Sequence, residues 1–208
     1  MKRRLLLASA ASLIPATLLG FAGRAHAQAG VPEAERFIAD LSRRAIADLT
    51  DLSLSDAERA RRFGVLLRAH FDVPAIGQFV LGRYWRIATE AERNEFQRLF
   101  ENYLIQIYAK RFKDYTGENL RVDRTRAAAA DEIVVNSTIL RSQLGPALVV
   151  WRLRRAGGGF RIFDVAVEGV SLAITHRDDF AAYIQRSGGK VEALLAWLRD
   201  KAKQGPVA

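Results

Sequence analysis

The repeat of apolar residues changes at Gly117, and this change limits the fold more than any single motif does. Before Gly117, apolar side chains recur every three or four residues, which predicts amphipathic helices. Beyond Ser171 the helical repeat returns, at 176–186 and 191–203. Between these regions apolar and polar residues alternate, which predicts β-strands at 120–126, 133–140, 147–155 and 160–167. The order predicts one α+β domain with N-terminal helices, a four-stranded antiparallel meander and two C-terminal helices.

Local signals predict where the first helices begin and end. An amphipathic helix is expected at 31–49, and Asp72 before a proline is expected to start another. Ser55 and Thr89 are each followed three residues later by glutamate, which is the capping-box pattern of a helix start. The helix from Thr89 has the longest apolar face, and we expect it to end near Gly117, where glycine can adopt a left-handed conformation.

The predicted strand at 160–167 carries an aspartate among apolar residues. A glycine run at 157–159 predicts a tight hairpin before it, and Glu168–Gly169 predicts a bend out of the sheet after it. Alternation would put Asp164 on the face opposite Phe163, Val165 and Val167. We therefore expect Asp164 to point outward and to pair with Arg152 or Arg154.

The first 27 residues have the pattern of a cleaved export signal. Basic residues at 2–4 precede an apolar stretch at 5–21, and Ala25-His26-Ala27 fits a signal peptidase site before Gln28. Arg3-Arg4 is also compatible with twin-arginine export, but an ordinary secretory signal is the expectation. The mature chain, 28–208, has the size of a single domain.

Composition excludes several classes of function. The chain has no cysteine, which excludes an acylated lipoprotein anchor, disulfides and thiolate metal sites. The signal holds four of the 32 basic residues and no acid, so the mature chain keeps a net charge of +5. Because the protein is exported, we expect this charge to attract anionic lipid headgroups or an acidic partner, and not nucleic acid.

Residues for catalysis or metal binding are few. Only His70 and His176 follow the signal, and no H-E-x-x-H motif or G-x-S-x-G elbow is present. Asp164 is the best candidate for a general base, since some curved α+β folds use one strand aspartate in this role. The alternative to a protein that only binds is thus a small exported hydrolase or isomerase that uses Asp164 or His176. We expect that the protein is not an enzyme and that it binds no metal.

Three separated segments together resemble one known family. They are FDVPAIGQFVLGRYWR at 71–86, YTGENLRV at 115–122 and FDVAVEGVSLAITHRDDF at 163–180. In this order they are similar to the MlaC family of periplasmic phospholipid-binding proteins. The family is also called the toluene-tolerance proteins and includes a branch found with hopanoid biosynthesis genes. Thr175-His176 departs from the polar and aromatic residues usual at that turn.

The resemblance implies a periplasmic lipid carrier without catalytic residues or cofactor, whose cargo is a phospholipid. Such carriers hold acyl chains in an apolar cavity between sheet and helices. They exchange lipid with an inner-membrane ABC transporter that has a lipid-binding subunit and with an outer-membrane lipoprotein–porin complex, which maintains outer-membrane lipid asymmetry. A monomer is expected. A hopanoid or another lipid is the alternative cargo.

The resemblance also directs attention to the apolar residues that would line such a cavity. Each of them alone would be explained by ordinary core packing, so the prediction concerns the set. The predicted sheet wall consists of Ile133, Val135, Ile139, Val149, Trp151, Leu153, Phe163, Val165 and Val167. The predicted helix side consists of Tyr103, Leu104 and Ile107, with Phe79 and Val80 nearby.

Overall fold

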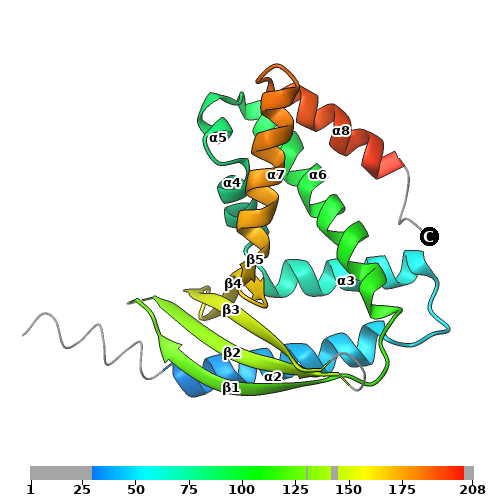
Figure 1. Ribbon diagram of the computed structural model, residues 1–208, viewed down its shortest axis with the longest axis vertical. Helices are drawn as coiled ribbons and strands as arrows, with labels where there is room; N and C mark the ends of the chain where they lie inside the picture. Colours follow the sequence, from blue (N-terminus) through cyan, green and yellow to red (C-terminus); the bar gives the residue numbers. More distant parts are fainter. Residues whose placement is uncertain (1–29, 130, 142–144, 204–208) are drawn as a thin grey trace, which may run out of the picture.

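The computed structural model describes residues 30–129, 131–141 and 145–203 (Figure 1). The α+β fold predicted from the sequence is confirmed, while the predicted signal at 1–27 lies outside the described residues. The helices are α2 (Val31–Leu49), α3 (Asp56–His70), α4 (Val73–Leu81), α5 (Tyr84–Ile87), α6 (Glu90–Ala109), α7 (Leu172–Arg186) and α8 (Val191–Lys203), with a 3-10 turn η1 (Lys110–Phe112). The strands are β1 (Asn119–Ala127), β2 (Glu132–Leu140), β3 (Ala147–Ala156), β4 (Gly159–Val167) and β5 (Val170–Ser171).

The strands form one antiparallel sheet in the order β1-β2-β3-β4-β5. The short β5 corrects the prediction of four strands. Glu168 and Gly169 have φ values of 52° and 81°, so they turn the chain back to pair with β4 and do not lead it out of the sheet. The predicted hairpin between β3 and β4 is confirmed, because Gly157 and Gly158 connect these strands with positive φ.

Capping side chains account for the helix starts. The capping box of α6 is confirmed, since Thr89 and Glu92 each accept a hydrogen bond from the other's backbone N–H. α7 begins at Leu172 and not at 176 as predicted, because the Ser171 hydroxyl accepts a hydrogen bond from the Ile174 N–H at 3.1 Å. α6 ends at Ala109 and passes into η1, well before the predicted end near Gly117.

The two faces of the sheet differ in chemistry. One face, which we call the packed face, carries the alternating apolar residues of β2 and β3, and α2 lies against it alongside β1 and β2 (Figure 1). Ile133, Val135 and Leu153 are almost fully buried there. The opposite face, which we call the arginine face, carries Arg121, Arg124, Arg126, Arg152, Arg154 and Arg161.

The buried residues form two separate cores. One lies between α2 and the packed face, and the other is made by α3, α4, α6, α7 and α8, which gather above β4 and β5 in Figure 1. Phe71 packs against both cores, and a β-bridge joins it to Ile162. None of the helices in the described part of the chain is long and apolar enough to span a membrane.

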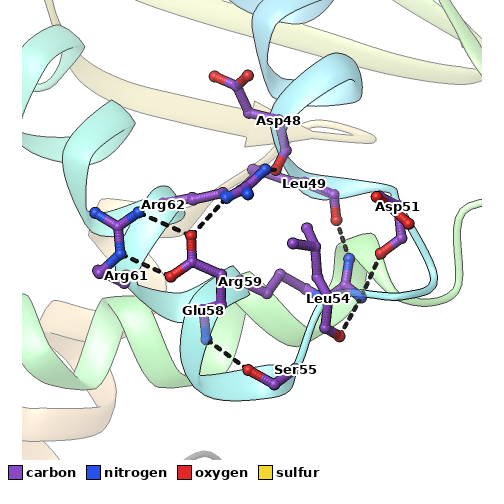
Figure 2. A network of polar contacts seen from close by, with 9 residues as sticks. All are labelled: Asp48, Leu49, Asp51, Leu54, Ser55, Glu58, Arg59, Arg61 and Arg62. Carbon is purple, nitrogen blue, oxygen red and sulfur yellow. Dashed lines mark hydrogen bonds and ion pairs between the residues drawn. The ribbon is translucent and has the colours of Figure 1, made fainter.

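A buried arginine ties the corner between α2 and α3 (Figure 2). The Arg59 side chain is 1% exposed, and it donates hydrogen bonds to the carbonyl oxygens of Leu49, Asp51 and Leu54. These bonds satisfy backbone acceptors at the end of α2 and in the loop that follows. Arg59 therefore connects α2 to α3, which leads into the helical core.

Candidate functional site

A hollow of about 190 Å³ lies where α4 and α7 approach the arginine face of β3 and β4. Ile76 and Ala173 are buried in it, whereas Phe79 and Ile174 are 44% and 43% exposed. The helix side of the hollow is therefore apolar, and the sheet side contributes arginines. Its lining residues are Ala75, Ile76, Phe79, Arg152, Arg154, Phe163, Asp164, Ala173 and Ile174.

A β-bulge in β4 produces the sheet side of this hollow. Leu153 is opposite Ile162 and Arg152 is opposite Asp164, so Phe163 is the extra residue. The Phe163 ring lies 4.9 Å from the guanidinium carbon of Arg152 and 4.2 Å from that of Arg154. Phe163 thus lies on the arginine face, and the prediction that it shares a face with Val165 and Val167 is wrong.

The sequence contains a signal for this bulge. Phe160 and Ile162 are apolar at even positions, whereas Phe163, Val165 and Val167 are apolar at odd positions. The phase of the alternation therefore changes between positions 162 and 163. An extra residue at that point keeps apolar side chains of both halves on the packed face, because Phe160 and Ile162 pack there with Val165.

Asp164 is buried, which corrects the prediction that it points outward. Its carboxylate accepts hydrogen bonds from the Ser171 hydroxyl at 2.8 Å and from the Ala173 N–H at 3.2 Å. No ion pair of the described residues joins it to Arg152 or Arg154, so the predicted pairing is also wrong. The carboxylate sits at the first turn of α7, where a negative charge is stabilised.

A second, larger cleft of about 620 Å³ shares Phe79 with the hollow. Arg177 lies over the Phe79 ring at 5.0 Å and pairs with Asp178 at 3.1 Å. Phe79 therefore borders both spaces. The cleft is lined by Phe79, Leu81, Gly82, Arg83, Tyr84, Arg177, Asp178, Ala181, Ala182 and Gln185.

The structure does not bring the predicted cavity residues together. Ile133, Val135 and Leu153 are buried against α2, with Trp151 and Val165 packed at the border of that core. Val149 is buried, Ile139 is half-buried, and Val167 is 36% exposed. Val80, Tyr103 and Leu104 belong to the helical core, and Ile107 is half-buried on the same helix as Tyr103. Of the predicted set, Phe79 and Phe163 line the hollow.

His176, the other candidate for catalysis, lies in the helical core. Its Nε2 is 3.1 Å from the Tyr108 hydroxyl, and the rings of Phe100, Tyr103 and Phe180 contact it. Burial lowers the pKa of His176 and raises the pKa of Tyr108 to about 12. His176 lines neither the hollow nor the cleft, and within the described residues no group of three or more His, Asp or Glu side chains could hold a metal ion.

Comparison with known proteins identifies the family. The family model described as MlaC protein matches residues 39–200, which include all three segments noted in the sequence. The chain belongs to the MlaC family. The toluene tolerance protein ttg2D of Pseudomonas putida is 26% identical over 122 residues, which cover 58% of this chain and 57% of that protein.

Two further relatives agree with this assignment. The MlaC binding protein of the intermembrane phospholipid transport system of Haemophilus influenzae is 20% identical over 132 residues, which cover 62% of this chain and 61% of that protein. The chain thus matches about three fifths of the length of both curated relatives. A phospholipid-binding protein of Ralstonia solanacearum, solved in complex with a phospholipid, shares the fold with a TM-score of 0.73. It is 22% identical, and the match covers 83% of this chain and 98% of that chain.

Proposed function

We propose that this MlaC-family chain is a periplasmic phospholipid carrier, and that acyl chains enter it at the hollow between the sheet and helices α4 and α7. The observation that carries this proposal is the hollow itself, where apolar side chains of two helices face arginines of the sheet. Such a space suits a molecule with an apolar part and an anionic part. The names of the Haemophilus and Ralstonia relatives, which refer to phospholipid, support it.

The energetics explain why such a carrier is needed. A phospholipid with two long chains has roughly 30 methylenes, and exposing each to water costs about 0.8 kcal/mol, or on the order of 20 kcal/mol in total. A lipid therefore crosses an aqueous compartment only when a protein covers its chains. The carrier's affinity for the lipid needs to match that of the bilayer and not to exceed it, because the carrier must also release the lipid.

The hollow has to widen to accept a lipid. At 190 Å³ it is smaller than the roughly 300–1,000 Å³ of pockets for drug-sized ligands, which are themselves smaller than a phospholipid. The two cores share no buried residue, so the widening would fall between them and would move Phe163, which packs against the helical core. Phe71, which contacts both cores, would lie at the hinge. The predicted wall residues Ile133, Val135, Val149 and Leu153 would contact lipid only if α2 also moved away.

The remaining parts of the proposal concern the cell. We propose export through a cleaved signal at 1–27, a monomeric mature protein, and exchange of lipid with an inner-membrane ABC transporter and an outer-membrane lipoprotein–porin complex. A hopanoid is the alternative cargo. The hydrolase alternative is weakened because both oxygens of Asp164 already accept hydrogen bonds and His176 is enclosed by aromatic rings.

The test is to purify the mature protein without detergent and to identify its bound molecules by native mass spectrometry. We expect about one phospholipid per chain, and a protein that is consistently empty would refute the proposal. Ile174→Trp places bulk at the exposed rim of the hollow and should reduce lipid occupancy. Ile87→Trp is the matched control, because Ile87 is 69% exposed and lines neither the hollow nor the cleft.

A further inference from the structure

Three arginines of the arginine face differ in how their charges are used, and two of them, Arg152 and Arg154, line the hollow. Arg152 donates hydrogen bonds to Glu132 at 3.0 and 2.9 Å, so its charge is balanced. Arg161 donates to the carbonyl oxygens of Arg68 and Ala69 at the end of α3. Arg154 takes part in none of the ion pairs or hydrogen bonds found among the described residues, and its contact is the Phe163 ring.

The Phe163 ring at the bulge brings the guanidinium groups of Arg152 and Arg154 to one place. The guanidinium carbons of Arg152 and Arg154 lie 4.9 and 4.2 Å from the centre of the same Phe163 ring. The two guanidinium groups are therefore close neighbours. Arg152 already donates from Nε and Nη2 to Glu132, whereas the N–H groups of Arg154 have no hydrogen-bond acceptor among the described residues and can donate to a ligand. The Asp164 carboxylate accepts hydrogen bonds from Ser171 and Ala173, and it accepts none from Arg152 or Arg154.

Other charges on the arginine face increase the positive potential at this point. Arg126 and Arg152 are the cross-strand neighbours of Val134 on this face, and Arg126 is exposed. The six arginines of this face outnumber its three acids, Asp123, Glu132 and Asp164. An anion that reaches Arg154 therefore meets a net positive field.

We propose that Arg154, supported by Arg152, binds the phosphate group of the lipid that the hollow takes up. This assignment rests on the proposed function. The phosphate is the point of a phospholipid where the apolar chains end, and Arg154 lies where the apolar helix side of the hollow meets the sheet. A guanidinium group donates two parallel N–H bonds to phosphate oxygens, which a single ammonium group does not.

The test compares two lipids in a fluorescent-lipid displacement assay on the mature, delipidated protein. Phosphatidylglycerol and diacylglycerol with the same acyl chains differ in the phosphate-containing headgroup. We expect the wild-type protein to bind phosphatidylglycerol about tenfold or more tightly than diacylglycerol, as expected for hydrogen bonds to a charged group. Arg154→Gln should remove most of this preference, and Arg154→Lys should retain part of it.

Arg124→Gln is the matched control, because Arg124 is an exposed arginine of the same face that does not line the hollow. It should keep the wild-type preference. Equal binding of the two lipids by the wild-type protein, or equal losses in Arg154→Gln and Arg124→Gln, would overturn the phosphate assignment. Binding of neither lipid would instead refute the carrier proposal. Displacement of phosphatidylglycerol by millimolar inorganic phosphate would assign Arg154 to a free anion, which also overturns the inference.

Discussion

The two faces of the sheet differ in their surroundings, since one is buried in a core and the other borders the candidate site. The packed face carries the alternating apolar residues of β2 and β3, and α2 covers it so closely that Val135 and Leu153 are fully buried. The arginine face has an interrupted alternation at the bulge, and its side chains border the hollow. The regular repeat of β2 and β3 thus marks a core, and the bulge in β4 marks the edge of the candidate site.

The largest expected effect comes from truncating the packed face. Leu153→Ala removes a fully buried side chain and should lower the free energy of unfolding by about 2–5 kcal/mol. Ile174→Ala, at the exposed rim of the hollow, should lower it by less than about 1 kcal/mol. Urea unfolding followed by circular dichroism measures both.

Leu153→Ala and Ile174→Ala together test whether the two faces of the sheet differ in this way. If Leu153→Ala were tolerated as well as Ile174→Ala, the contact between α2 and the sheet would have free space. The packed face would then again be a candidate for the lipid cavity. Lipid occupancy measured on the same samples separates the two roles, since we expect Ile174→Ala to lower lipid occupancy with little loss of stability.

Much of the fold could be predicted because it depends on local patterns. The capping box at Thr89, the glycine hairpin after β3 and the alternation of β2 and β3 act over a few residues, and each is confirmed. The coverage of the packed face by α2 could not be predicted in this way, because an amphipathic helix carries no record of the sheet face that it will meet. For the same reason Tyr103 and Leu104 were expected opposite the sheet, whereas they pack in the helical core.

The site was harder to predict than the fold because it depends on one inserted residue. A bulge moves every later side chain of the strand to the other face, so strict alternation misplaced Phe163. The role of Asp164 also depends on the turn at Glu168 and Gly169, which returns the chain so that the first turn of α7 meets the carboxylate. Phe163 contacts arginines of β3, and Asp164 accepts hydrogen bonds from Ser171 and Ala173, so the surroundings of both residues depend on segments outside β4.

An intermediate effect is expected at Asp164, which links the arginine face to α7. Asp164→Asn removes a negative charge from the start of the helix and weakens the bonds to Ser171 and Ala173. We expect a loss of about 1–2 kcal/mol in the free energy of unfolding, as for the loss of a helix cap. Thermal unfolding of the variant beside the wild-type protein measures this loss.

The control for this prediction is Asp178→Asn, which removes an acid on the same helix whose ion pair with Arg177 is exposed. Exposed pairs contribute only about 0–1 kcal/mol, so this variant should unfold close to the wild-type temperature. A stable Asp164→Asn protein would mean that the carboxylate does not hold α7. The catalytic alternative for Asp164 would then regain support.

The smallest effect is expected at His176, where the helical core can be compared with the packed face by changing pH alone. Burial lowers the pKa of His176 below its usual 6.5, so the unfolded chain takes up the proton more readily than the folded one. The stability contributed by neutral His176 is present above pH 6.5 and is lost as the pH falls through the lowered pKa. Each pH unit can change the free energy of unfolding by at most about 1.4 kcal/mol. We therefore expect wild-type stability to fall between about pH 7.5 and 5.5, while most carboxylates stay ionised.

His176→Gln should flatten this decline, and His70→Gln should retain it, because His70 lies half-buried at the end of α3, outside the aromatic cluster. His176 is enclosed by rings of the helical core, so the part of the decline that His176→Gln removes reports on that core. An identical decline in His176→Gln and wild-type protein would show that protons enter the core without cost. The helical core would then be packed less tightly than the core between α2 and the sheet, and it would be the first region to examine for bound lipid.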